Sequence, residues 1–517
     1  MAIIWLYLTL KQNKNLHRGT QNSTENHREN IKMPPLNRNN ILVGVVIAVF
    51  LTAFSWWIFA RPSYNVVERV PGLDNRPAQK PISDSVLIGE FFDTLGTSTE
   101  IIDGSWPRFR GRDFDNISKD PTPLAETWDT SGPHVEWQIT LGEGYAGPAV
   151  MNGRVYVLDY NEKKKADMLR CFSLKSGTEL WRRWYNVEFK RNHGYSRTIP
   201  AVTDKYVVTI GPRSHVMCVE PLNGSLIWSV DLEKEYGIPG TIKGKITPEF
   251  YCGQCPLIDN DMAIIAPGGK ALMIGIDCAT GKVLWKTPNP DSLRMSHTSI
   301  IPMTILGKKM YVYAALGGIC GVSAEGGDTG RLLWKTTDWS PSIAVASPVY
   351  LGNGEIAAFG SYGAGAARIK ITGNESGFSA SVIEQHKSSG GIASEQQTPI
   401  LQDDNLWTVL PENAGVLKKQ LVCYQKSNFI TPVWSSGKES RFGKGMGPFI
   451  MSNDKLYLLD DEGELYLFRI ENNKAILVAS HKIMNAIEAW SPMAIAGKYL
   501  LLRDSHNMLC LNIGKKE

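Results

Sequence analysis

The sequence lacks the short motifs that mark several common classes of catalytic site. Its 517 residues contain no His-Glu-x-x-His zinc helix, no Gly-x-Ser-x-Gly nucleophile elbow and no phosphate-binding loop. The formal net charge is only +4, and no basic stripe alternates with aromatic residues. These absences exclude the enzyme classes that depend on those motifs, and they argue against a nucleic-acid partner.

A helical apolar period is also missing, which argues against a solenoid of stacked helices. The chain has 48 glycines and 43% hydrophobic residues, a composition typical of a globular protein with many turns. One Gly-x-Gly lies in residues 360–367, but it joins two predicted strands and opens no helix. Nucleotide binding is therefore not expected there.

The eight cysteines do not predict a disulfide framework, because the chain is long rather than small. Cys252 and Cys255 form a Cys-x-x-Cys pair, a pattern found in redox and zinc sites. No second pair follows at zinc-finger spacing, and a strand rather than a helix comes next. Structural thiols are the favoured interpretation, with the redox state of this pair left open. Small core residues in apolar strand-like runs are predicted at Cys171, Cys218, Cys320, Cys423 and Cys510.

An uncharged run near the N-terminus is long enough to cross the ~30 Å hydrocarbon core of a bilayer. Trp56, Trp57 and Phe59 would form an aromatic anchor at one interface. A cleaved signal peptide is the alternative, although its apolar region usually spans only ~7–15 residues. The predicted segments are a disordered tail over 1–40 with Met33 as an alternative start, a membrane anchor over 41–60 and a linker over 61–105.

A unit led by proline occurs eight times after the linker, at spacings of 44 to 56 residues. Each copy contains a short apolar segment, a tight polar turn such as Asn152-Gly153, and a β-rich run. Four antiparallel strands repeated every ~40–50 residues are typical of propeller blades. Each proline fits at the start of a strand, where its missing N–H is tolerated. The eight prolines are Pro148, Pro200, Pro256, Pro302, Pro348, Pro399, Pro448 and Pro492.

A Gly-to-Trp segment ends most copies. In residues 171–181, 218–228 and 275–285 a glycine stands four positions before a tryptophan. The eighth copy stops before its Trp-bearing strand, whereas residues 134–141 supply such a strand ahead of the first copy. We therefore predict that this N-terminal strand closes the ring. Copies five and seven lack the tryptophan and should dock differently. The predicted structural tryptophans are Trp137, Trp181, Trp228, Trp285, Trp334 and Trp434.

Residues 275–285 resemble the tryptophan-docking motif of eight-bladed pyrroloquinoline quinone (PQQ) repeat propellers. Residues 106–118, "WPRFRGRDFDNIS", are similar to the lead-in of bacterial PQQ-like repeat proteins. This family includes quinoprotein alcohol dehydrogenases and the propeller lipoprotein of the outer-membrane β-barrel assembly machinery. The resemblance covers residues 106–517 and implies an all-β, eight-bladed propeller. The Lys and Arg residues flanking the membrane segment do not decide its orientation. An extracytoplasmic, periplasmic location is therefore expected from the resemblance.

Strand order places the long connections between blades on one face of the predicted ring. Arg forks, imidazoles and amides on that face could bind an anionic or carbonyl-rich ligand. Arg197 is the leading candidate, because it lies three residues before Pro200 at the predicted channel mouth. Ordinary solvation of a loop face is the alternative. The other candidates are His193, Tyr195, Arg213, His215, Gln254, Lys270, His297, Gln396, Glu412, Asn413, Arg441, Trp490, Asp504 and His506.

The resemblance also raises the possibility of a PQQ-dependent oxidoreductase of the alcohol or sugar dehydrogenase type. Such enzymes are expected to carry adjacent cysteines over the quinone and Glu, Asn and Asp ligands around Ca²⁺. This sequence has no Cys-Cys dipeptide, and Glu412-Asn413 imitates only part of the calcium set. The favoured expectation is therefore a membrane-anchored scaffold without catalytic or metal-binding residues. It would bind a protein or extracellular ligand on the long-loop face, with a role in cell-envelope assembly.

Overall fold

The computed structural model describes residues 38–60, 86–97, 100–238, 241–242, 245–246, 251–374 and 376–515. The chain divides into two compact units, residues 1–82 and 83–517. In the first unit, α2 (Arg38–Phe59) contains a segment, Leu42–Phe59, that is long and apolar enough to span a membrane. The predicted tail before Arg38 and most of the predicted linker lie outside the described residues.

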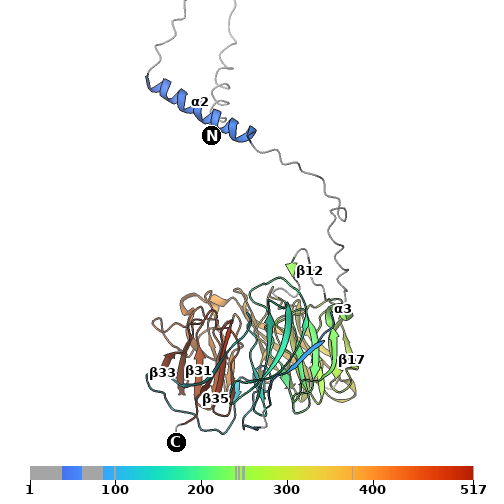
Figure 1. Cartoon of the computed structure of the whole chain (residues 1–517). Helices are drawn as coiled ribbons and strands as arrows, with labels where there is room; N and C mark the ends of the chain where they lie inside the picture. Colours follow the sequence, from blue (N-terminus) through green and yellow to red (C-terminus); the bar gives the residue numbers. More distant parts are fainter. Residues whose placement is uncertain are drawn as a thin grey trace, which may run out of the picture. The chain divides into compact units, whose positions relative to one another are not determined.

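The second unit is an eight-bladed propeller, which confirms the predicted fold (Figure 1). Each blade is a four-stranded antiparallel sheet whose strands follow one another outward from the ring axis. Blade 1 contains β4 (Ala149–Met151), β5 (Arg154–Asn161), β6 (Ala166–Ser173) and β7 (Glu179–Asn186), and blade 2 contains β8 (Ala201–Val202), β9 (Val207–Ile210), β10 (His215–Val219) and β11 (Leu226–Asp231). Blade 3 contains β14 (Leu257–Asp259), β15 (Met262–Ile265), β16 (Ala271–Asp277) and β17 (Val283–Pro288). Blade 4 contains β18 (Ile301–Ile305), β19 (Lys308–Ala315), β20 (Gly318–Ser323) and β21 (Leu332–Thr336).

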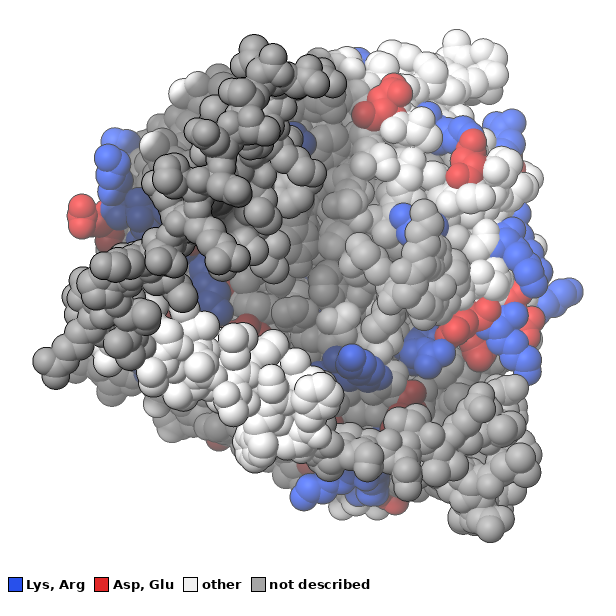
Figure 2. Space-filling view, turned by 90° about the horizontal axis from the view of Figure 1, so that it is seen from above, with Lys and Arg blue, Asp and Glu red and all other residues white. Residues whose placement is uncertain are grey.

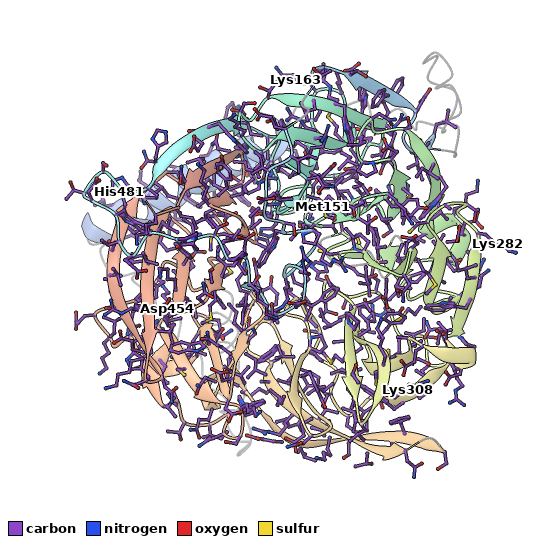
Figure 3. All side chains as sticks on the ribbon, turned by 90° about the horizontal axis from the view of Figure 1, so that it is seen from below. Met151, Lys163, Lys282, Lys308, Asp454 and His481 are labelled. Atoms are coloured by element: carbon purple, nitrogen blue, oxygen red, sulfur yellow. The ribbon has the colours of Figure 1, made fainter. Side chains whose placement is uncertain are left out.

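The remaining blades have the same strand order. Figure 3 shows that Met151, at the end of the first strand of blade 1, lies nearer the middle of the ring than Lys163 and Lys282. Blade 5 contains β22 (Val349–Gly352), β23 (Glu355–Gly360), β24 (Gly365–Asn374) and β25 (Gly377–His386), and blade 6 contains β26 (Ile400–Gln402), β27 (Asn405–Val409), β28 (Leu421–Gln425) and β29 (Trp434–Ser435). Blade 7 contains β30 (Phe449–Ser452), β31 (Lys455–Leu459), β32 (Glu464–Glu471) and β33 (Lys474–Lys482). Blade 8 contains β34 (Ala494–Ala496), β35 (Tyr499–Arg503), β36 (Asn507–Asn512) and β3 (His134–Thr140).

Several short elements lie outside the four-stranded blades. The connection between blades 2 and 3 carries α3 (Leu232–Tyr236) and the hairpin of β12 (Thr241–Ile242) and β13 (Lys245–Ile246), and three 3₁₀ turns occur at Gly326–Asp328, Ser388–Gly390 and Gly415–Leu417. Within the predicted linker, β1 (Phe91–Thr94) adds an antiparallel strand outside β7. Phe91 stacks on Trp184 there, at 5.6 Å between ring centroids. β2 (Ile117–Ser118) pairs in parallel with β30.

The prolines lie where a missing N–H costs least. Six of them immediately precede the first strand of a blade. Pro302 is instead the second residue of β18, and Pro492 lies two residues before β34. The Asn152-Gly153 turn has φ values of 50° and 71°, as a tight two-residue hairpin requires.

Strand β3 closes the ring, as predicted. It pairs antiparallel with β36, with Trp137 opposite Cys510. The Trp137 side chain is buried, and its indole N–H donates to the carbonyl of Leu174 in blade 1 at 2.8 Å. The first blade strand in sequence thus belongs to the last blade, so the ends of the ring share one sheet.

The repeated glycines receive the tryptophan of the preceding blade. A Cβ on Gly177 would lie 2.7 Å from the Trp137 ring, and a Cβ on Gly281 would lie 2.7 Å from the Trp228 ring. Gly281 also has φ of 72°, a conformation that other residues rarely adopt. Blade 5, which lacks this tryptophan, instead packs Phe378 against the cluster between blades 4 and 5.

Residues 106–118, called the channel plug below, cross the middle of the ring. Trp106 pairs with Val150 of blade 1, through two backbone hydrogen bonds of 2.8 Å. The Pro107 carbonyl accepts from the N–H of Val202 in blade 2 at 2.8 Å. The plug therefore begins against the inner strands of the first two blades.

The plug ends at blade 7, which only blade 8 separates from blade 1 in the closed ring. The Asn116 amide donates to the carbonyl of Phe449 at 2.6 Å, and Ile117 pairs with Met451, both in blade 7. Between these ends, Phe114 packs against the clusters of blades 3 to 5. Because the plug contacts blades 1, 2 and 7 at its ends and blades 3 to 5 between them, it blocks the channel.

Candidate functional site

The face with the connections between blades is the more elaborate one, as predicted from strand order. Figure 2 views this long-loop face from above: described Lys and Arg side chains and Asp and Glu side chains alternate around its visible rim. No field of a single sign therefore covers the visible part of this face. A cavity of about 360 Å³ opens on the face above the plug.

Five of the sequence-predicted site residues meet in this cavity. They are His193, Arg197, His297, Gln396 and Trp490. Each comes from a connection that precedes the first strand of a blade, which explains why they converge on the ring axis. The sequence argument from strand order placed these residues on one face, but it did not predict a cavity or separate them from their neighbours.

Several other candidates are buried in structural roles. Both atoms of the Gln254 amide are bonded: its oxygen accepts from the N–H of Ala266 at 2.9 Å and its nitrogen donates to Tyr313 at 3.0 Å. Asp504 caps a turn by accepting from the N–H groups of His506 and Asn507. Two further candidates are buried away from the cavity, since Tyr195 stacks on Tyr160 at 4.2 Å and His215 lies inside β10.

The remaining candidates do not line the cavity. Glu412 is paired with Lys418 and Lys419, whose charges lower the pKa of its carboxyl to about 2. Arg213 pairs with Glu233 at 2.7 Å. Lys270, Arg441 and His506 are exposed, as are Glu412 and Asn413. His506 forms a 2.7 Å hydrogen bond with Ser505.

Arg197 holds the wall of the cavity in place. Its guanidinium donates to the carbonyls of Tyr195 at 3.0 Å and His193 at 2.8 Å, and to that of Asn192. Burial lowers the pKa of Arg197 to about 10, so the group remains cationic at neutral pH. These three bonds use three of the five guanidinium N–H groups, and two are left for other acceptors.

An aromatic pair forms another wall. Trp490 stacks on Tyr145 at 5.3 Å, and its indole N–H donates to the buried carboxylate of Asp461. The Tyr145 hydroxyl donates to Glu488 at 2.6 Å. Tyr145 was missed from the sequence because it precedes the first proline unit, in the short connection between β3 and β4. The pair is an apolar surface fixed at both polar ends.

The floor of the cavity was also missed. It is formed by Phe109, Arg110 and Asn116 of the plug. The only available signal was three arginines within residues 106–112, since the family resemblance gave this segment no position. Glu395 is another missed lining residue, which accepts from the N–H of Tyr362 at 2.8 Å and whose carboxyl pKa is raised by burial.

A buried carboxyl between blades 1 and 2 supplies a pH test of this packing. Asp167 accepts from the Tyr185 hydroxyl at 2.7 Å, yet burial raises the pKa of Asp167 to about 7. An unfolded aspartate has a pKa of about 3.9. The folded protein therefore holds a proton between these values that the unfolded chain releases, and this contribution to stability is lost as pH rises toward 7.

We expect Asp167→Asn to remove this part of the pH dependence. Between pH 4 and 7 the free energy of unfolding of the natural protein should fall by up to about 1.4 kcal/mol per pH unit relative to the variant. Urea unfolding at several pH values measures this difference. Asp403→Asn, at an exposed turn, is the matched control and should keep the natural pH profile. Identical profiles for all three proteins would contradict the buried carboxyl.

The residues do not assemble the calcium set of a quinoprotein. Glu412 is held by two lysines outside the cavity, and Asn413 lies beside Gly363. In the described part of the chain, no group of three or more His, Cys, Asp or Glu side chains is placed to hold a metal. Cys252 and Cys255 are both buried free thiols, and burial raises the pKa of Cys255 to about 11. Unreactive thiols are expected from such burial.

Comparison with known proteins gave one matching family model and several similar solved structures. A family model described as outer membrane protein assembly factor BamB matches residues 121–235 and 165–476. BamB from Moraxella catarrhalis is 10% identical with a TM-score of 0.46, over 73% of this chain and 99% of that one. A europium-containing methanol dehydrogenase is 10% identical with a TM-score of 0.41, over 77% and 89%. A quinohemoprotein alcohol dehydrogenase from Comamonas testosteroni is 9% identical with a TM-score of 0.42, over 80% and 81%. No match was found among curated protein sequences.

Proposed function

Because this chain belongs to the PQQ-repeat propeller family described as outer membrane protein assembly factor BamB, we propose that it is a non-catalytic binding scaffold for cell-envelope assembly. It is anchored in the membrane by α2 and works on the extracytoplasmic side. The partner is a polypeptide that docks on the long-loop face. The apolar segment Leu42–Phe59 supports the anchor, and the family supports the location.

The observation that carries this proposal is that several polar groups of the cavity form hydrogen bonds within its own walls. The Ser299 hydroxyl accepts from the N–H of Cys255 at 3.0 Å, and the Ser361 hydroxyl donates to the carbonyl of Glu395 at 2.6 Å. Arg197 and Trp490 are bonded to the wall in the same way. Such bonds fix a rigid surface for recognition, whereas general acid–base or nucleophilic catalysis requires a base within reach of a nucleophile.

Position-resolved photo-crosslinking in native membranes tests this proposal. A photoreactive residue is placed at Val416, which is 76% exposed on a loop between the second and third strands of blade 6. Leu306, which is 45% exposed in the turn between β18 and β19 on the opposite face, is the matched control. We expect a polypeptide of defined mass to be crosslinked from Val416 and not from Leu306.

Two results would contradict the scaffold. Crosslinks from Leu306 alone would place the partner on the other face. Stoichiometric retention of added PQQ and Ca²⁺, lost in Arg197→Ala, would instead support a quinoprotein oxidoreductase. Mass spectrometry and absorbance of the purified full chain measure that retention.

A further inference from the structure

The cavity on the long-loop face is blind, and this restricts what can enter it. Its floor is the channel plug, which is fixed to the inner strands of blades 1, 2 and 7. In Figure 3 the ribbon seen from below shows chain crossing the middle of the ring. A polypeptide that enters from the long-loop face cannot pass through, so it must either end inside or turn back.

The size of the cavity disfavours a chain that turns back. Its volume of about 360 Å³ is near the lower limit of small-ligand pockets, which span ~300–1,000 Å³. A hairpin needs two strands ~4.8 Å apart together with its turn residues. A chain end needs only one extended strand and its last side chain, which is compatible with this volume.

The charge of the lining favours an anion. Two guanidinium groups, those of Arg110 and Arg197, line the cavity, and neither has an ion pair with a described carboxylate. Glu395 is the one carboxylate among the described lining residues, and burial raises the pKa of its carboxyl. The three bonds of Arg197 to carbonyls leave two of its five N–H groups able to donate to a ligand. A carboxylate oxygen is a strong acceptor for a single N–H of a guanidinium, because the hydrogen bond is charge-assisted on both sides.

The rest of the lining favours an apolar side chain. The Trp490–Tyr145 pair presents an aromatic surface, and Ile199, Val345 and Met446 also line the cavity. A ligand that satisfies both parts of the lining carries a carboxylate next to an apolar group. The last residue of a polypeptide has this combination whenever its side chain is apolar.

We propose that the cavity captures the C-terminus of the partner polypeptide, with the terminal carboxylate at Arg197 and an apolar last side chain against Trp490. The inference rests on the proposed function, since it identifies which part of a partner the long-loop face recognises. It makes Arg197 a specificity determinant: the same sequence without a free C-terminal carboxylate is rejected, because a neutral end gives the part-buried cation no opposite charge and leaves its remaining N–H groups without the stronger, charged acceptor.

Fluorine NMR of model peptides tests this inference on the purified full chain. The probes are the acetylated hexapeptide Gly-Ser-Gly-Ser-Gly-(4-fluoro)Phe with a free carboxylate, and the same peptide with a C-terminal amide. We expect saturable binding of the acid and at least about tenfold weaker binding of the amide. Arg197→Gln should reduce the affinity of the acid to that of the amide. Arg441→Gln, at an exposed arginine outside the cavity lining, is the matched control and should bind like the natural protein.

Each other outcome overturns the inference. Equal binding of acid and amide, or no binding of either, removes the role of the terminal carboxylate in the unaltered protein, whether or not the Arg197 variant folds. Equal or tighter binding of 4-fluorophenylacetate assigns the cavity to a small aromatic acid. If these failures occur while Val416 still crosslinks a partner and Leu306 does not, the scaffold stands and only the mode of recognition is wrong.

Discussion

Arg110→Ala is expected to lower the free energy of unfolding by about 3–5 kcal/mol, the largest effect of any single change considered for the propeller. The Arg110 side chain is 5% exposed and donates to four backbone carbonyls. Two of them belong to the plug, and the other two, of Thr398 and Pro399, belong to blade 6 at 2.8 and 3.1 Å. Alanine would leave buried acceptors without donors and a void in the channel.

Arg112→Ala is the matched control, because Arg112 lies in the same plug but is exposed. It donates only to the Ser105 hydroxyl, at 2.8 Å. Its loss should change the free energy of unfolding by less than about 1 kcal/mol. Urea unfolding of both variants in detergent, with trypsin cleavage of the plug as a second readout, measures the contrast. Equal stability of the two variants would show that the plug does not hold the channel closed.

The fold was predictable because its signals are local and repeated. Pro148 and its seven counterparts each begin a unit whose turns and strands follow from nearby residues, as the Asn152-Gly153 turn shows. Ring closure followed by elimination, since the Trp137 strand had no blade of its own and the last blade lacked one. The structure pairs these two partners.

The membership of the site was only partly predictable. Strand order decides which face a loop joins, and this brought Arg197, His297 and Trp490 to the cavity. It does not decide whether a polar side chain is already bonded. The Gln254 side chain is already hydrogen-bonded to Ala266 and Tyr313, and His215 faces Asp231 within its blade. Neither residue lines the cavity.

The plug was the part that sequence reasoning could not place. Arg110 bonds to Thr398, 288 positions away along the chain, through a backbone carbonyl. A carbonyl acceptor is present at every residue, so the sequence carries no pattern that identifies the partner of such a bond. The blind end of the cavity therefore emerges only from the three-dimensional structure.

Closure of the ring by β3 completes the eighth blade and encloses the plug within the ring, so it is the central claim of the account. Thr140 and Asn507 are direct partners across β3 and β36, and the Thr140 side chain is exposed. Directly opposed residues of an antiparallel pair have Cα atoms ~4.5–5.5 Å apart, which suits a disulfide. The eight native cysteines are buried and should not compete.

The most direct test is mild oxidation of the full chain carrying Thr140→Cys and Asn507→Cys, read by non-reducing electrophoresis and peptide mass spectrometry. Nearly complete intramolecular crosslinking is predicted. Thr140→Cys combined with Asn473→Cys, at an exposed turn of blade 7, should remain uncrosslinked. Absence of the first crosslink, or equal crosslinking of both pairs, would contradict a ring closed by this strand and with it the blind cavity on the long-loop face.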